Sequence, residues 1–142
     1  MKKIIKTSLL LLWLFLIYYL SSQTGSVSGG LSEKILREIA IFINQFIKID
    51  IDSFVKSSHF LFRKGAHFME YFILYILSIE CFKEYKDKPS AIYTLLFVIL
   101  YACFDEFHQL FVGGRAGQIR DVLIDSSGAI FSSLIWHKLF KK

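Results

Sequence analysis

The sequence predicts an all-α integral membrane protein, a four-helix bundle with an amphipathic helix in its first external loop. Two observations predict this class. Hydrophobic residues make up 54% of the 142 residues, and the mean hydropathy is +0.49, which is too apolar for an ordinary soluble domain. Only 20% of the residues are charged and there is one proline, so disordered, collagen-like and coiled-coil classes are excluded.

Four apolar runs are long enough to cross a bilayer, for which about 20 helical residues are needed. The first run follows Lys2 and Lys3 and has no small-x-small cleavage site after it, so we expect a retained helix rather than a signal peptide. Together the runs predict one membrane domain over residues 1–142, with spans at residues 4–20, 66–82, 90–107 and 119–136.

The long stretch between the first two spans has three parts. Its Ser-Gly-rich opening, residues 24–30, predicts a loop. Residues 53–62 are rich in apolar side chains and could extend the second span outward. Between these parts, apolar residues recur at the spacing of one helix face, namely Ile35, Leu36, Ile39, Ile43, Phe46 and Ile47. This one-sided pattern is typical of a helix on the membrane surface and equally of a helix packed on the bundle.

The distribution of basic residues predicts which side of the membrane each end faces. Cytoplasmic loops retain an excess of Lys and Arg. Nine of the 17 basic residues lie in the two ends and the short middle loop, namely Lys2, Lys3, Lys6, Lys83, Lys86, Lys88, Lys138, Lys141 and Lys142. We therefore expect a multi-pass protein of the cell membrane with both termini cytoplasmic, and no nucleic-acid partner despite the net charge of +5.

Polar residues gather where four antiparallel spans must share one membrane face. This face receives the end of the first and third spans and the start of the second and fourth. An ionisable group inside an apolar span costs at least ~2.5 kcal/mol unless it faces the bundle interior or water. We therefore expect a convergent site of Gln23, Arg63, Lys64, His67, Glu70, Asp105, Glu106, His108, Gln109, Arg115, Arg120, Asp121 and Asp125.

The spacing of these residues supports convergence. Three pairs lie three or four residues apart and so share a helix face: His67 with Glu70, Asp105 with His108, and Asp121 with Asp125.

Small residues should bring the last span and the third loop close to the site. Gly128 and Ser132 continue the stripe of Asp121 and Asp125, so the last span can approach its neighbours closely. The glycines of residues 113–117 predict a compact turn that folds Arg115 back over the helix ends, toward Glu106 and Asp121.

Four ordered motifs lie at matching places in the four spans. They are Ser22-Gln23, Arg63-Lys64-x-Ala66-His67-Phe68-x-Glu70-Tyr71, Asp105-Glu106-x-His108-Gln109, and Gly114-Arg115-x-Gly117-x-x-Arg120-Asp121-Val122-x-x-Asp125-x-x-Gly128. Together they resemble the motifs of the VanZ-like membrane protein family, over nearly the whole chain. Two positions depart from the family pattern, with Gly113 where proline is common and Asp125 where asparagine is frequent. The resemblance implies a small protein of the cell envelope whose name-giving relatives are linked to teicoplanin resistance.

Three interpretations of the polar site stay open. In the first, the basic residues only neutralise the carboxylates and hold the helices together. In the second, the site binds a lipid-linked or cell-wall and surface-polymer group, with its anion held by arginines. The third is an acid-base enzyme, a hydrolase or transferase. Its catalytic residues would be His67, Glu70, Asp105, His108 and Asp121, and the other candidates would bind substrate.

No cofactor and no metal is expected, because neither an H-E-x-x-H motif nor a cysteine set is present. A less favoured variant has a divalent ion bound by His67, Glu70, Asp105 and His108. The expected partners are the lipid bilayer and the envelope ligand, and the oligomeric state is open.

Overall fold

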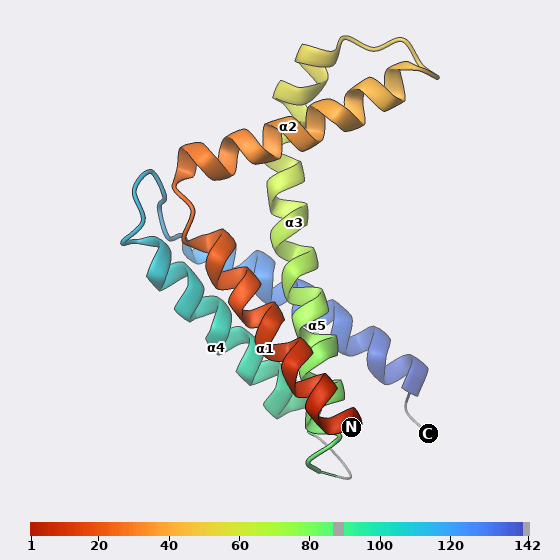
Figure 1. The fold of residues 1–142 in the computed structure, drawn as a ribbon, viewed down its shortest axis with the longest axis vertical. Coiled ribbons are helices and arrows are strands. Elements are labelled where there is room, and N and C mark those ends of the chain that lie inside the picture. Colours follow the sequence, from red (N-terminus) through yellow and green to blue (C-terminus); the bar gives the residue numbers. More distant parts are fainter. Residues whose placement is uncertain (87–89, 141–142) are drawn as a thin grey trace.

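The computed structural model describes residues 1–86 and 90–140, and within these residues it contains five helices and no strand (Figure 1). The predicted all-α class is confirmed. The helices are α1 (Lys2–Ser21), α2 (Gly25–Asn44), α3 (Ile51–Phe82), α4 (Ala91–Gln109) and α5 (Ile119–Phe140).

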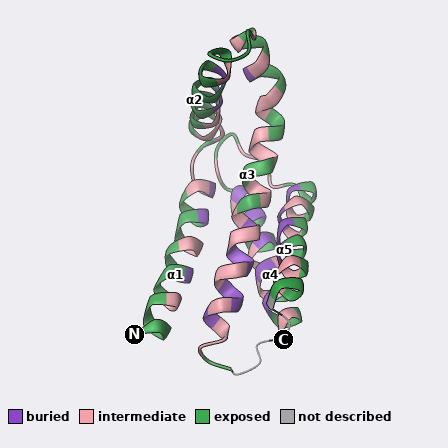
Figure 2. Ribbon diagram, turned by 90° about the vertical axis from the view of Figure 1, so that its right-hand side faces the viewer, coloured by how far each residue is buried: buried purple, intermediate pink, exposed green. Residues whose placement is uncertain are grey.

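The long helix α3 is the centre of the fold. It contacts each of the other four helices, and its half nearer the C-terminus holds half of the largest fully buried side chains. Tyr71, Leu74, Tyr75 and Ile79 are completely buried there, in one cluster with residues of α1, α4 and α5. Figure 2 shows buried residues along this part of α3. The outward extension predicted for residues 53–62 is confirmed, because α3 begins at Ile51.

Three of the helices, α1, α3 and α4, are long and apolar enough to cross a membrane. Over its described residues, α5 is long enough but not apolar enough to be counted with these three, because Asp125 and several serines lower its mean hydropathy. Its surface nevertheless exposes large apolar side chains, including Leu123, Phe131 and Leu134. That α5 is a fourth span therefore stays a prediction.

Helices α1, α3, α4 and α5 alternate in direction (Figure 1). The chain's first residues and the end of α5 lie at one end of the molecule, together with the end of α3. The ends of α1 and α4 and the start of α5 lie toward the opposite end, beneath α2. This arrangement brings the segments that carry the candidate site residues toward one end of the molecule, as expected for helices that alternate in direction.

The loop predicted for residues 24–30 is wrong, because α2 begins at Gly25. The first glycine of this segment, Gly25, allows a close contact with the third loop. The N–H of Gly25 donates to the carbonyl of Gly113 at 3.1 Å, and a Cβ on Gly25 would collide with the backbone of Gly114. Gly114 itself has a φ of 74°, a value that favours glycine. Contact with the third loop thus holds α2 in a helix that composition alone disfavours.

Helix α2 crosses the outer part of α3 and packs on it (Figure 1). Leu36 and Ala40 are buried against Val55 of α3, and Ile39 and Phe42 of α2 stay exposed. A contact with α3 is therefore part of the fold, and a location at the membrane surface stays a prediction.

The close approach predicted at Gly128 is confirmed. A Cβ there would collide with the carbonyl oxygen of Phe68, so the backbones of α3 and α5 nearly touch. Ala129 and Ser132 are buried in the same contact. This packing carries Asp121 and Asp125 to the side of α3 that bears Lys64 and His67.

Candidate functional site

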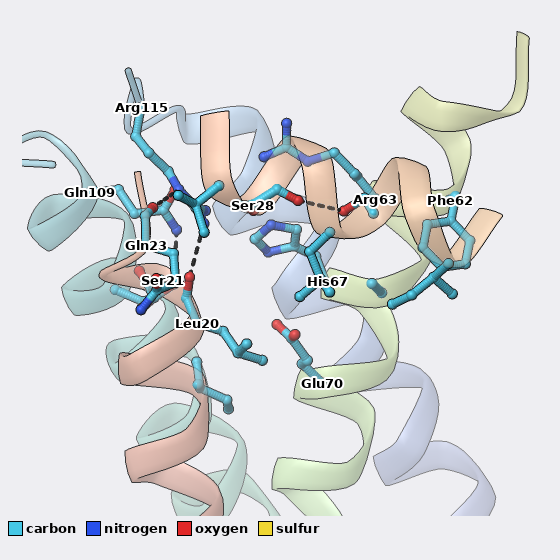
Figure 3. A pocket seen from close by; sticks show the side chains of 17 residues that line it. Leu20, Ser21, Gln23, Ser28, Phe62, Arg63, His67, Glu70, Gln109 and Arg115 are labelled. Atoms are coloured by element: carbon cyan, nitrogen blue, oxygen red, sulfur yellow. Dashed lines mark hydrogen bonds between the residues drawn. The ribbon is translucent and has the colours of Figure 1, made fainter. Parts of the chain in front are cut away.

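A pocket of about 220 Å³ lies where the end of α1, the underside of α2 and the middle of α3 meet. Figure 3 shows Arg63, His67 and Glu70 projecting from α3 toward the end of α1, where Gln109 and Arg115 lie. Seven of the predicted site residues line this pocket: Gln23, Arg63, His67, Glu70, Asp105, Gln109 and Arg115.

Part of the pocket lining is apolar. Ile17 and Leu20 of α1 and Phe62 of α3 contribute to it, and α2 adds Val27, Leu31 and Ile35 together with the hydroxyls of Ser28 and Ser32. Sequence reasoning missed the contribution of α2, because the start of this helix was predicted as a loop. The four-residue spacing of Val27, Leu31 and Ile35 was the available signal.

Arg115 folds back over the helix ends, but it contacts neutral acceptors rather than the predicted Glu106 and Asp121. Its Nε donates to the carbonyl of Gln23 at 2.9 Å, its Nη2 to the carbonyl of Leu20 at 2.9 Å, and its Nη1 to Oε1 of Gln109 at 3.3 Å. Burial and the nearby positive charge of Arg63 lower the pKa of the Arg115 guanidinium. Arg115 thus caps the C-terminus of α1 by donating to carbonyls at its end and just beyond it.

Arg63 and Glu70 are the uncommitted charges of the pocket. Neither side chain has a hydrogen-bond or ion-pair partner among the residues that the structure describes. Both are partly exposed and lie on opposite sides of the His67 ring (Figure 3). The guanidinium of Arg63 is therefore available to a ligand.

Lys64 and Asp121 form an ion pair between α3 and α5. The distance from Nζ to Oδ1 is 2.5 Å, and the side chains are only 19% and 11% exposed. The Asp121 carboxylate is committed to this pair, which makes it a weaker candidate for proton transfer than His67 or Glu70.

A second cluster joins α3, α4 and α5 beside the pocket. Nδ1 of His67 lies 3.4 Å from Oδ1 of the fully buried Asp125. Glu106, which is also buried, accepts hydrogen bonds from the backbone N–H of Gln118 at 2.9 Å and from the side-chain amide of Gln109 at 3.3 Å.

In the described part of the chain, the group whose ligand atoms lie within 4.8 Å of one another is His67, Glu106 and Asp125. This group could hold a metal ion. The less favoured metal site predicted from the sequence combined His67 with Glu70, Asp105 and His108 instead.

His108 and Arg120 lie outside the pocket. The His108 ring packs on Tyr18 of α1, with ring centroids 4.7 Å apart. Arg120 is exposed and lies 5.2 Å from the centre of the Phe60 ring. The structure therefore brings together most of the predicted site, but not these two residues.

No curated protein and no solved structure matches this chain. The model of the VanZ/LLP1 family matches residues 7–141, which is nearly the whole chain, in agreement with the motifs that surround the pocket. The chain belongs to the VanZ/LLP1 family.

Proposed function

We propose that this chain is a multi-pass protein of the cell envelope whose pocket binds the anionic group of a lipid-linked or surface-polymer component. The observation that carries the proposal is the guanidinium of Arg63, which has no partner among the described residues, in a pocket whose lining is partly apolar. A guanidinium presents a planar fork of N–H donors that phosphate and carboxylate accept in pairs.

The lining of the pocket suits both parts of an amphipathic molecule. It contains the guanidinium groups of Arg63 and Arg115 together with apolar side chains that include Leu31, Ile35 and Phe62. A ligand with an anionic head and a hydrocarbon chain would find matching chemistry for each part. A purely water-soluble anion would leave the apolar lining residues without a partner.

Neutralisation alone explains the polar residues poorly. Within the described cluster, Lys64 and Asp121 form an ion pair, and His67 lies 3.4 Å from Asp125, a contact that is an ion pair only when the imidazole is protonated. Glu70, Asp105 and Glu106 have no cation within 4 Å among these residues, and Arg63 has no carboxylate. A network built only to hold helices together would pair such charges, because unpaired buried charge is costly.

The pocket should open on the outer side of the membrane. Its lining residues come from the end of α1, the start of α2 and the middle of α3. Figure 1 shows these segments away from the end of the molecule that holds the chain's first residues, and lysines gather at that other end. By the positive-inside rule the lysine-rich end is cytoplasmic. Envelope components carried on lipids would then reach the pocket from the outer leaflet.

Native mass spectrometry of the full chain in detergent tests the proposal, with a long-chain polyprenyl phosphate as the probe and the matching polyprenol as the neutral control. We expect the chain to retain the phosphate at least about tenfold better than the alcohol, and Arg63→Gln to remove most of this preference. The matched control is Arg37→Gln, because Arg37 lies on α2 at the same end but pairs with Asp52 outside the pocket. Equal retention of phosphate and alcohol, or equal loss in both variants, would contradict the proposal.

An acid-base enzyme is the second candidate, and the observation that favours it is that His67, Glu70 and Asp105 line one pocket. His67 would act as general base beside the bound anionic group. His67→Ala and Asp105→Asn should then abolish turnover of a bound substrate while folded protein remains in the membrane. Loss of folded protein in step with turnover would instead indicate a structural role.

A link to glycopeptide resistance is a further part of the proposal, and it rests on family membership. Cells that express the chain should become less susceptible to teicoplanin, and the Arg63→Gln variant should remove this effect. Unchanged susceptibility with well-expressed protein would separate this chain from the resistance phenotype.

A further inference from the structure

We propose a second site beside the pocket, in which His67, Glu106 and Asp125 bind one divalent transition-metal cation. The three residues come from α3, α4 and α5, so the site would join three helices. One ligand atom of each residue lies within 4.8 Å of the others, close enough for one ion to contact all three after small side-chain movements.

The strongest evidence is that Asp125 is buried without a hydrogen-bond partner in the part of the chain that the structure describes. Its side chain is 0% exposed, and neither carboxylate oxygen has a hydrogen-bond partner among the described residues. Nδ1 of His67, at 3.4 Å from one of these oxygens, also lacks one. Buried polar atoms are nearly always hydrogen-bonded, so two adjacent side chains with three such buried atoms between them indicate a missing partner.

The charges of the cluster indicate a cation. Glu106 is only 4% exposed and adds a second carboxylate to that of Asp125. Lys64, one helical turn from His67 on α3, is committed to Asp121. A divalent ion would neutralise both carboxylates with the imidazole of His67 uncharged. A protonated His67 would neutralise only one of them and would leave Oδ2 of Asp125 without a partner.

The donor set selects the kind of ion. One imidazole nitrogen with two carboxylate oxygens suits Zn²⁺ or Mn²⁺, and Mg²⁺ and Ca²⁺ prefer oxygen ligands throughout. Three protein ligands would leave at least one coordination position open.

Glu106 is already oriented as metal ligands commonly are. The backbone N–H of Gln118 donates to its Oε2 and the Gln109 amide to its Oε1. Each carboxylate oxygen still has a free lone pair for an ion.

Equilibrium dialysis of the full chain in detergent, after chelator treatment, tests the proposal with Zn²⁺ alone and separately with Mn²⁺ alone. We expect one ion per chain, and at least about tenfold weaker binding in Asp125→Asn and in Glu106→Gln. Glutamine at 106 keeps an oxygen for the Gln118 N–H, so this variant should retain the fold and gives a second, independent test of the site.

The matched control is His59→Asn, which removes a histidine of the same helix that contacts the Gly29 carbonyl instead of the cluster. It should bind the ions as the wild type does. Failure of the folded wild type to bind either ion would overturn the proposal, and so would equal losses in His59→Asn and Glu106→Gln. Because no anionic lipid is present in this assay, its outcome is independent of the proposed pocket function.

Discussion

Nδ1 of His67 lies 3.4 Å from the carboxylate of Asp125, and this contact connects the pocket to the interface between α3 and α5. His67 also lines the pocket, so its orientation toward a ligand depends on a residue that no ligand in the pocket can reach directly. The interior of the bundle and the pocket are therefore coupled through one imidazole ring.

The first prediction concerns Asp125→Asn. Without metal, the variant should unfold at a higher temperature than the wild type, because an amide replaces a buried carboxylate that has no hydrogen-bond partner among the described residues. Zn²⁺ should raise the unfolding temperature of the wild type alone. At 100 times its dissociation constant, the ion would add about 2.7 kcal/mol to the free energy of unfolding. An equal rise for both proteins would show that Asp125 is not a ligand.

The second prediction concerns the ion pair of Lys64 and Asp121. Lys64→Met should lower the free energy of unfolding by about 3 kcal/mol, because the Asp121 carboxylate is then left without its cation at an 11% exposed position. A double-mutant cycle with Asp121→Asn should give a coupling energy of about 1–3 kcal/mol.

The control for this cycle is the pair of Arg37 and Asp52, 2.8 Å apart with side chains 44% and 81% exposed. Its coupling energy should stay below about 1 kcal/mol. Equal coupling in the two pairs would mean that burial does not strengthen the Lys64 pair.

The third prediction tests the close contact of α3 and α5. Gly128→Ala should lower the free energy of unfolding by about 1–3 kcal/mol, since the new Cβ forces α5 away from the Phe68 carbonyl. Gly65→Ala is the control, because Gly65 is also helical and a Cβ there meets nothing within 4 Å. It should be neutral or stabilising. Comparable losses in thermal unfolding would refute a specific role for Gly128.

The sequence predicted the helices well and the partners of single side chains less well. Long apolar runs define α1 and α4 to within a few residues, because burial in lipid leaves few alternatives. The helical start of α2 was missed, since its cause is a contact with Gly113 and Gly114, far away in the sequence.

Two site residues illustrate the same limit. The carbonyl partners of Arg115 could not be predicted, because backbone acceptors leave no mark in a sequence. His108 shares a face with Asp105, but residues three apart differ by about 60° around a helix. At the edge of α4, this difference is enough to direct His108 to Tyr18 and Asp105 to the pocket.

The fourth prediction concerns the proposed orientation. In a chain whose Cys81 and Cys103 are replaced by alanine, Gly30→Cys should react with an impermeant thiol reagent on intact cells, and Lys86→Cys should not. Residue 30 is exposed near the pocket, and residue 86 is exposed at the lysine-rich end. The opposite labelling pattern would show that the topology is inverted and that the pocket faces the cytoplasm.

The last prediction concerns Arg115, whose guanidinium reaches the Leu20 and Gln23 carbonyls and the Gln109 side chain at once. An ammonium carries its three donors on one nitrogen and cannot reproduce the planar spread of Nε, Nη1 and Nη2 that reaches these three acceptors. Arg115→Lys should therefore lower the free energy of unfolding by about 1.5–3 kcal/mol, nearly as far as Arg115→Ala, although it keeps the charge. Insertion into the membrane should be unchanged.

Retention of polyprenyl phosphate should fall in Arg115→Lys almost as far as in Arg115→Ala, because Leu20 and Gln23 line the pocket and lose their fixed position. The control Arg37→Lys should change neither stability nor retention appreciably, since Arg37 contacts only exposed carboxylates. If lysine at position 115 preserves both properties, positive charge alone is needed there, and the role of the guanidinium in holding the end of α1 is wrong.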